Sequence, residues 1–160
     1  MFLSAFIGSF SHVLLDSIMH SDVERLELSV MMFNIDDFKH INDSYGHPFG
    51  DLVIQKLAEI GLTVLRNEDI MGRIGGEEYF CVLPRTNVKQ CLQVAVRMLK
   101  SIRSYNFETA DNKSFSDTVS IGIATLSESC VNGSALYAQA DKALYQSKKE
   151  GKNKVTVFIE

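Results

Sequence analysis

The chain has 160 residues, of which 46% are hydrophobic and 22% are charged, and its formal net charge is −4. This size suits one globular domain over residues 1–160, and two prolines and ten glycines exclude a collagen-like or low-complexity chain. The mildly acidic balance argues against a nucleic-acid polymer as a partner, and three cysteines without a CxxC pair favour a cytoplasmic protein without disulfides or zinc.

The first 15 residues are uncharged and largely apolar. This stretch is shorter than the roughly 20 residues of a spanning helix, and it lacks the basic leading segment of a signal peptide. Phe10, Leu14 and Ile18 recur at helical spacing, so we expect a helix over residues 9–20. It is either a packing helix of a soluble domain or the remnant of a membrane or linker segment. We therefore expect the protein to lie in the cytoplasm. It is either a soluble protein there or the cytoplasmic part of a membrane-anchored protein.

Apolar runs and helical periodicity alternate along the remaining chain. The apolar runs predict strands over residues 28–34, 70–74, 78–83, 118–125 and 154–158. Helical spacing of apolar residues predicts helices over residues 53–64, 87–103 and 134–149, and Asn87 and Gln90 are placed like a capping box at the start of the second. The polar residues 35–51 are predicted to be rich in turns. Interleaved strands and helices, with a hairpin at the glycine pair Gly75 and Gly76, predict an α/β (α+β) fold with a mixed sheet packed by helices.

The predicted hairpin, RIGGEEYFCVLP, carries the most informative chemistry. Gly75 and Gly76 allow a backbone to pass close to a ligand. Glu77 and Glu78 follow at the start of a predicted strand, where side chains alternate, so they are expected to face opposite ways and to have different roles. The alternative is a simple turn with two solvated acids.

Two further segments carry polar groups near the ends of predicted elements. Residues 35–51 follow a buried strand, which is where α/β folds place ligand sites, and a helix that starts there offers free N–H groups to a phosphate. Asn42 and Asp51 also suit ordinary helix and turn capping. Lys148 and Lys152 lie near the end of a predicted helix, where they either complement the helix dipole or neutralise a polyphosphate.

Four segments, taken together, resemble the signatures of the GGDEF domain family, the diguanylate cyclases: NIDDFKHINDSYGHPFGD, RIGGEEYFCVLP, TVSIGIA and ADKALYQSKKEGKNKV. They occur in order over a motif-bearing region of residues 28–156, whereas residues 1–27 form a divergent N-terminal helix region. Tyr79 replaces the phenylalanine of the family's GG(D/E)EF motif. The resemblance implies a central mixed five-stranded sheet surrounded by helices, similar to nucleotidyl cyclase catalytic domains and polymerase palm domains.

The resemblance also implies a reaction and a substrate site. A homodimer in which each subunit holds one GTP would join two GTP molecules into cyclic di-GMP and release two pyrophosphates. Asn42 and Asp51 would bind guanine through its N1–H and N2–H₂ donors. Gly75 and Gly76 would let the chain lie against the nucleotide. The phosphates would be received by Asp37, Phe38 and Lys39 through backbone N–H groups and by Lys148 and Lys152 through their charge.

By the same resemblance, Glu77 would bind Mg²⁺ or Mn²⁺ together with Asn34 and the Ile35 carbonyl, and Glu78 would help to deprotonate the attacking 3′-hydroxyl. The family normally has aspartate where this chain has Asn34, and a neutral amide binds hard cations more weakly. We therefore expect GTP binding with reduced or absent turnover. The alternative is a catalytically degenerate GGDEF domain that acts as a GTP or cyclic di-GMP sensor or interaction module.

Two further features of the resemblance concern regulation. Arg66 and Asp69 form an RxxD motif shortly before the glycine pair, which the family uses as an inhibitory site for the product, although such residues are also common at helix ends. The family usually opens with a DxLTGLxNR segment, in place of which this chain has MFLSAFIG. Family members commonly carry an upstream sensor domain that controls dimerisation, so such a domain is an expected partner.

Overall fold

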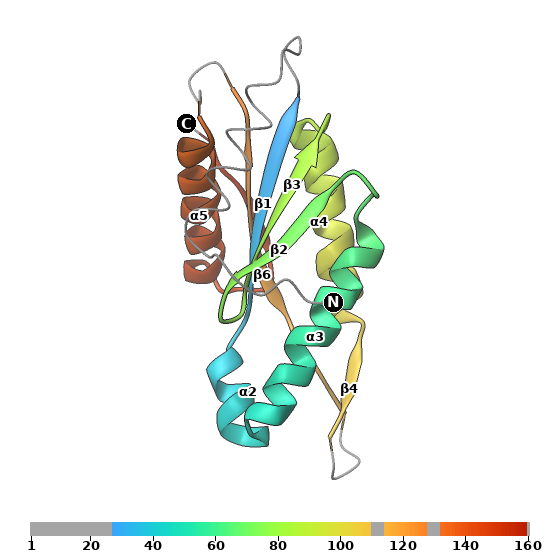
Figure 1. Ribbon diagram of the computed structural model, residues 1–160. Coiled ribbons are helices and arrows are strands. Elements are labelled where there is room, and N and C mark those ends of the chain that lie inside the picture. Colours follow the sequence, from blue (N-terminus) through green and yellow to red (C-terminus); the bar gives the residue numbers. More distant parts are fainter. Residues whose placement is uncertain (1–26, 110–113, 128–131, 160) are drawn as a thin grey trace.

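The computed structural model describes residues 27–109, 114–127 and 132–159 (Figure 1). The helix expected over residues 9–20 lies outside these ranges, as does all of the divergent region of residues 1–27 except its last residue. No helix in the described ranges is long and apolar enough to cross a membrane. The described elements are β1 (Leu28–Ile35), α2 (Phe38–Tyr45), α3 (His47–Val64), β2 (Ile70–Gly75), β3 (Glu78–Pro84), α4 (Val88–Arg103), β4 (Asn106–Glu108), β5 (Ser114–Ser116), β6 (Val119–Thr125), α5 (Gly133–Lys149) and β7 (Val155–Val157).

The main sheet has five strands in the order β2-β3-β1-β6-β7. The β1 strand pairs antiparallel with β3 and β6, and β2 pairs antiparallel with β3, whereas β6 and β7 run parallel. This arrangement confirms the mixed five-stranded sheet surrounded by helices. All eight residues of β1 are buried, including the polar Ser29 and Asn34, as expected of a nearly continuously apolar strand that is covered on both faces.

Helices cover both faces of the sheet (Figure 1). Alternation along β1 directs Met31 and Phe33 toward a core that includes residues of α3 and α4, whereas Val30 and Met32 pack with residues of α5. The α4 helix begins with a capping box, in which the side chains of Asn87 and Gln90 bond each other's backbone N–H groups, as their spacing predicted.

Close packing of α5 on β6 depends on a single glycine. A Cβ built on Gly122 would lie 2.2 Å from Leu144 N and 2.3 Å from Ala140 O, which are both backbone atoms. Ser147 Oγ donates a hydrogen bond of 2.8 Å to Ile121 O and fixes the helix along the strand. This packing sets the position of the lysines at the C-terminal end of α5.

One expectation from the sequence is wrong, and one small sheet was not predicted. Residues 35–51 are largely helical rather than turn-rich, because Ile41 and Gly50 are buried and Pro48 stands at the start of α3, where it is tolerated. The β4–β5 hairpin, a separate two-stranded sheet, was not predicted. Its strands have three residues each, which is too short for a clear alternation signal, and they pair through Phe107 and Phe115.

Candidate active site

The β2–β3 hairpin brings two glycines and two glutamates to one end of the sheet. Gly75 pairs with Glu78, so Gly76 and Glu77 form the turn, and Gly76 has a positive φ of 33°. Arg73 Nε donates a hydrogen bond of 2.7 Å to Gly76 O and holds this turn. A Cβ built on either glycine would meet nothing within 4 Å, so the surface beside the turn has room for a ligand.

The two glutamates do not alternate along one strand, contrary to the sequence prediction. Because β3 begins at Glu78, Glu77 lies in the turn, where strand alternation does not apply. Their surroundings nevertheless differ. The Glu78 carboxylate lies 3.9 Å from Lys148 Nζ, and Glu78 stands opposite Asn34 in the register of β1 and β3. The Glu77 carbonyl accepts a hydrogen bond of 3.2 Å from Ile35 N.

The three expected metal ligands, Asn34, Ile35 and Glu77, therefore lie beside one another where β1 meets the hairpin. Asn34 is 5% exposed and offers a neutral amide oxygen, so Glu77 supplies the only carboxylate of this set. Among the residues described, no three His, Cys, Asp or Glu side chains gather into a metal site. Mg²⁺ in proteins is typically bound by one or two carboxylates together with substrate phosphates. The donors fit a metal ion that the nucleotide helps to hold.

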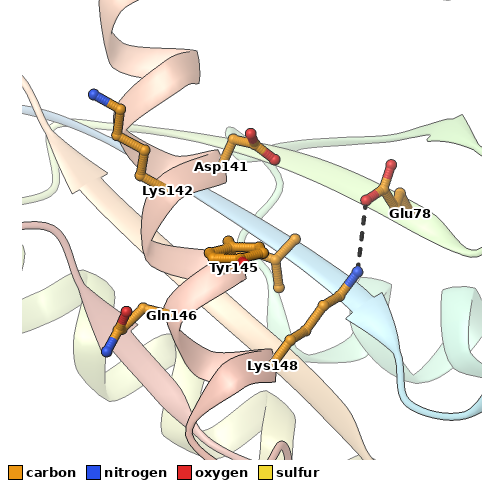
Figure 2. Close-up of a pocket in the computed structure, with 7 residues that line it drawn as sticks. Glu78, Asp141, Lys142, Tyr145, Gln146 and Lys148 are labelled. Atoms are coloured by element: carbon orange, nitrogen blue, oxygen red, sulfur yellow. Dashed lines mark ion pairs between the residues drawn. The ribbon is translucent and has the colours of Figure 1, made fainter.

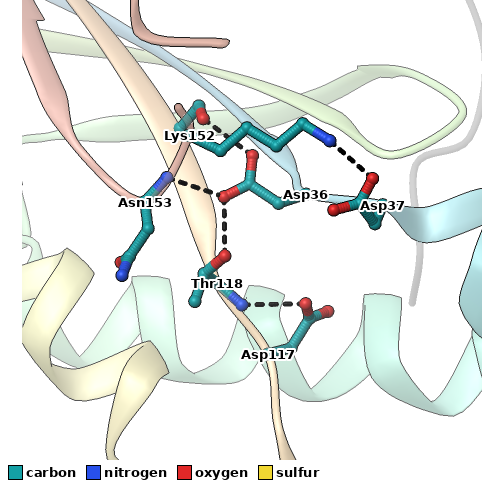
Figure 3. A network of polar contacts seen from close by, with 7 residues as sticks. Asp36, Asp37, Asp117, Thr118, Lys152 and Asn153 are labelled. Carbon is teal, nitrogen blue, oxygen red and sulfur yellow. Dashed lines mark hydrogen bonds and ion pairs between the residues drawn. The ribbon is translucent and has the colours of Figure 1, made fainter. Parts of the chain in front are cut away.

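Asp36 lies two residues after Asn34 and is the acid next in sequence to the position where the resemblance implies an aspartate, but its oxygens are occupied (Figure 3). Its carboxylate accepts hydrogen bonds from Thr118 Oγ1 at 2.7 Å, Ser120 Oγ at 2.7 Å and Asn153 N at 3.0 Å. With 5% exposure, this carboxylate joins β1, β6 and the turn after α5. Its role in the structure is to hold these segments together.

The N-terminal end of α2 lies next to a lysine from the turn after α5. Asp37 is the N-cap residue, with a left-handed backbone (φ 52°), and its carboxylate forms an ion pair of 2.5 Å with Lys152 Nζ (Figure 3). This carboxylate raises the pKa of the Lys152 ammonium. The first N–H groups of a helix have no partner within the helix, so those of Phe38 and Lys39 are suited to bind an anion.

Lys148 and Lys152 thus reach two parts of the expected phosphate site, the hairpin and the start of α2. Lys148 also lies in the last turn of α5, so its charge complements the helix dipole as well. Each lysine is paired with an acid, Glu78 or Asp37. A triphosphate would have to replace these surface ion pairs, which are individually weak.

Asn42 and Asp51 come from two consecutive helices. Asn42 lies in α2 and Asp51 in α3, and neither caps a helix, because the N-cap residues are Asp37 and Gly46. The Asn42 Oδ1 atom is buried and has no hydrogen-bond partner in the structure. It would lie 2.0 Å from a Cβ built on Gly50, so this glycine makes room for the amide beside Asp51. A buried acceptor without a partner is available to a ligand donor.

An open pocket that Glu78 and Lys148 line is also lined by residues that the sequence analysis missed (Figure 2). Its volume is about 390 Å³, and its lining includes Glu78, Asp141 and Tyr145, whose side chain is 65% exposed. The signal was present, because Asp141, Tyr145 and Lys148 follow a helical spacing of four and three residues that places them on one face of α5.

Asp117 is a second residue that sequence reasoning missed. It is 7% exposed, its Oδ1 accepts a hydrogen bond of 2.8 Å from Thr118 N, and its Oδ2 is buried without a partner. Burial raises the pKa of this carboxyl from 3.8 to about 7, the Thr118 N–H opposes the shift, and the nearby charges of Asp36 and Asp37 add to it.

Tyr79, at the family's phenylalanine position, has a structural role. Its ring stacks on Phe33 with centroids 4.8 Å apart, and its hydroxyl donates a hydrogen bond of 2.9 Å to Ile54 O. The side chain is buried, which raises the pKa of its phenol. The hydroxyl is therefore satisfied within the core.

The RxxD residues form a compact turn after α3. Arg66 N donates a hydrogen bond of 2.8 Å to Asp69 Oδ2, and Asp69 N donates one of 3.1 Å to Arg66 O. The Arg66 side chain is exposed, whereas Asp69 Oδ1 is buried without a partner. The local turn explains the pair structurally, and a product site at this turn stays a prediction.

The chain is similar in sequence to known proteins. A family model described as "Diguanylate cyclase, GGDEF domain" matches residues 9–154. Diguanylate cyclase A of Treponema denticola is 39% identical over 139 residues, which cover 86% of this chain and 37% of that protein. The chain spans well under half the length of this relative and of two further curated relatives that it matches.

Solved GGDEF domains have a similar structure. The GGDEF domain of PA1120 (YfiN or TpbB) from Pseudomonas aeruginosa gives a TM-score of 0.88 at 28% identity, with 96% of each chain covered. The GGDEF domain of DgcB from Caulobacter crescentus, in complex with c-di-GMP, gives a TM-score of 0.83 at 29% identity over 91% of this chain and 86% of that one.

Proposed function

Because the chain belongs to the GGDEF domain family of diguanylate cyclases, we propose that two copies of it condense two GTP molecules into cyclic di-GMP and two pyrophosphates. One observation carries this proposal: segments far apart in the sequence meet at one end of the sheet with groups suited to a guanine nucleotide. They are the hairpin glutamates, the start of α2, and two lysines, of which Lys148 lies in the last turn of α5 and Lys152 in the turn after it. We propose that this reaction takes place in the cytoplasm.

The substrate would bind through backbone and side-chain donors. Phe38 and Lys39 N–H groups at the start of α2 would receive the terminal phosphates, while Lys148 and Lys152 exchange their carboxylate partners for phosphate oxygens. The buried Asn42 Oδ1 and the Asp51 carboxylate are acceptors, and they suit the N1–H and N2–H₂ donors of guanine. Adenine lacks this donor pattern, so we propose GTP as the substrate.

The chemical step would use the hairpin glutamates. Glu78 would take the proton from the 3′-hydroxyl of one GTP as that oxygen attacks the α-phosphorus of the GTP held by the partner subunit, and pyrophosphate would leave. Glu77, Asn34 and the Ile35 carbonyl would hold Mg²⁺ or Mn²⁺, which when bound would offset negative charge on the attacking and leaving oxygens. The neutral amide of Asn34 would weaken this metal site and slow turnover.

A product assay tests the proposal. The purified chain is incubated with GTP and Mg²⁺ or Mn²⁺, and cyclic di-GMP is sought by chromatography, with Glu78→Gln as a matched control that keeps the shape of the side chain. We expect product from the wild type and none from the variant. Product from both proteins would contradict the role of Glu78 as the base. With ATP in place of GTP we expect no comparable turnover, and equal consumption of the two nucleotides would contradict GTP as the preferred substrate.

A second candidate function is a nucleotide sensor without turnover. Two observations support it: Asn34 is neutral, and the Asp36 carboxylate is hydrogen-bonded within the fold. Neither residue therefore supplies a carboxylate to the candidate metal site. GTP or cyclic di-GMP would then bind without being made, and Arg66 with Asp69 would be the candidate product site. An upstream sensor domain would pass signals in either case. Tight GTP binding by the wild type without any cyclic di-GMP would favour this second function.

A further inference from the structure

Four aromatic side chains, which we call the aromatic cluster, join α2 and α3 to the β4–β5 hairpin: Tyr45, Phe49, Phe107 and Phe115. Tyr45 stacks on Phe115 with centroids 5.3 Å apart and ring planes 10° apart. Phe49 lies 5.7 Å from Phe115 and 5.1 Å from Tyr45, and Phe115 stacks on Phe107 at 5.3 Å. Phe115 therefore contacts all three of the other rings.

The α2 helix depends on such contacts for its orientation. It has eight residues, of which only Ile41 is buried, and helices shorter than about 12 residues are marginal without tertiary packing. Tyr45, its last residue, remains 44% exposed even though its ring stacks on Phe115. The stack lies at the surface, so its effect is to hold the end of α2 rather than to enlarge the core.

Two members of the aromatic cluster lie close in sequence to the two residues expected to bind guanine. Asn42 lies three residues before Tyr45, on the same face of α2, and Asp51 lies two residues after Phe49 in α3. The Asn42 amide rests against Gly50, and its buried Oδ1 has no partner in the structure. Acceptors on two separate helices match a rigid base only if the angle between the helices is fixed.

We infer that Phe115 is a positioning residue for base recognition: through Tyr45 and Phe49 it fixes α2 against α3, so that Asn42 and Asp51 present their oxygens at the spacing of guanine donors. The inference rests on the proposed binding of GTP, and it adds a specificity determinant from a hairpin outside the main sheet. Phe115 itself touches no nucleotide in this scheme and acts only through the two other rings.

The experiment compares Phe115→Ala with Phe115→Tyr, which keeps the ring, and with Phe158→Ala, which deletes an equal ring from the core on the α5 side. All are made in the Glu78→Gln background so that nucleotide is not consumed. Dissociation constants for GTP and ITP are measured by calorimetry with Mg²⁺. ITP lacks the 2-amino group, so the ratio of the two constants reports recognition of the base edge.

For Phe115→Ala we expect GTP to bind about five- to tenfold more weakly, given the usual contribution of aromatic pairs, while ITP binding changes less and the discrimination ratio falls. The Tyr variant should restore the ratio and Phe158→Ala should leave it unchanged. Hydrogen exchange without nucleotide should show faster exchange of α2 amides in Phe115→Ala alone. Should Phe115→Ala fail to fold, the exposed Tyr45→Leu serves as the second variant.

The outcomes separate this inference from the proposed function. If the parent protein binds GTP and Phe115→Ala leaves both the discrimination ratio and α2 exchange unchanged, the inference is overturned while the function stands. If the parent binds neither nucleotide, the proposed function fails and the link to base recognition fails with it. Equal weakening of GTP and ITP would mean that Phe115 only stabilises the fold, which also overturns the inference.

Discussion

At the scale of single residues, the polar side chains at the end of β1 divide into structural groups and candidate ligands. Asp36 is fully engaged by donors from β6 and from the turn after α5, whereas Asn34 stands opposite Glu78 beside the hairpin. Two residues apart in the sequence, they cannot exchange roles, because their surroundings differ. The identity of residue 34 therefore controls how much negative charge the candidate metal site carries.

Replacing Asn34 with aspartate should raise the rate of cyclic di-GMP formation. A carboxylate would add a charged metal ligand, and a gain of about 3 kcal/mol in the transition state corresponds to roughly a hundredfold in kcat. Initial rates at saturating GTP and Mg²⁺ measure the effect. Gln93→Glu, which adds the same charge at an exposed position of α4, is the control. An unchanged or lower rate would contradict the proposal that the neutral Asn34 side chain slows turnover.

Asp117 should make the folded state less stable as pH rises. Its folded pKa of about 7 lies above the ordinary value of 3.8, so the folded protein binds more protons than the unfolded chain between these values. Linkage then makes the free energy of unfolding fall from about pH 4 to pH 7, after which this loss is complete.

Asp117→Asn should remove this fall, because the amide mimics the neutral acid and retains an oxygen for Thr118 N. Urea unfolding at about pH 4 and pH 8 measures the effect, with the variant similar to the wild type at the lower pH and more stable than it at pH 8. Asp43→Asn, at an exposed site, is the matched control. Parallel pH profiles of wild type and Asp117→Asn would rule this account out.

At the scale of elements, the contact between α5 and β6 determines where the lysines lie. Gly122 lets the helix backbone approach the strand, and Ser147 bonds the strand carbonyl of Ile121. Lys148 then reaches Glu78, and the turn that follows carries Lys152 to Asp37. A change in the depth of this packing would move the two cations away from the hairpin and from α2 together.

Gly122→Ala should therefore reduce both stability and nucleotide binding. The added Cβ would overlap the backbone of Leu144 and Ala140, and overpacking of this kind costs about 1–3 kcal/mol. Thermal unfolding and GTP titration measure the two effects. Gly72→Ala, where a Cβ meets nothing within 4 Å, should leave both nearly unchanged. If both variants unfolded at the same temperature and bound GTP equally well, α5 and β6 would be able to move apart at no cost in stability, which would contradict this expectation.

At the scale of the whole molecule, the described residues form one candidate nucleotide site per chain. The proposed reaction joins two nucleotides, so two chains must bring their sites together. The rate per chain should fall on dilution as dimers dissociate, while GTP binding per chain stays constant. Product rates over a range of protein concentrations, combined with sedimentation, test this expectation. A constant rate per chain where sedimentation finds only monomers would show that one chain suffices.

The parts of the fold that follow from contiguous patterns were predictable. The continuous apolar run of β1, the glycine pair of the hairpin and the Asn87–Gln90 capping box all appear in the structure as expected. Each depends on residues within a few positions of one another, so local physical rules suffice. The number of strands in the sheet was predicted only from the family resemblance. Four motifs in the same order identify a family, whereas a single short motif does not.

Tertiary structure decided the rest, because the partners are far apart in the chain. The acids Asp36 and Asp37 meet donors 82 to 117 residues away, and no local pattern distinguishes the acid that braces the fold from the one that pairs with Lys152. The α2 helix and the β4–β5 hairpin are individually too short to be predicted, and their aromatic side chains stabilise them only in contact. The sequence by itself determined the family and the candidate chemistry, whereas long-range packing determined which side chains remain available for it.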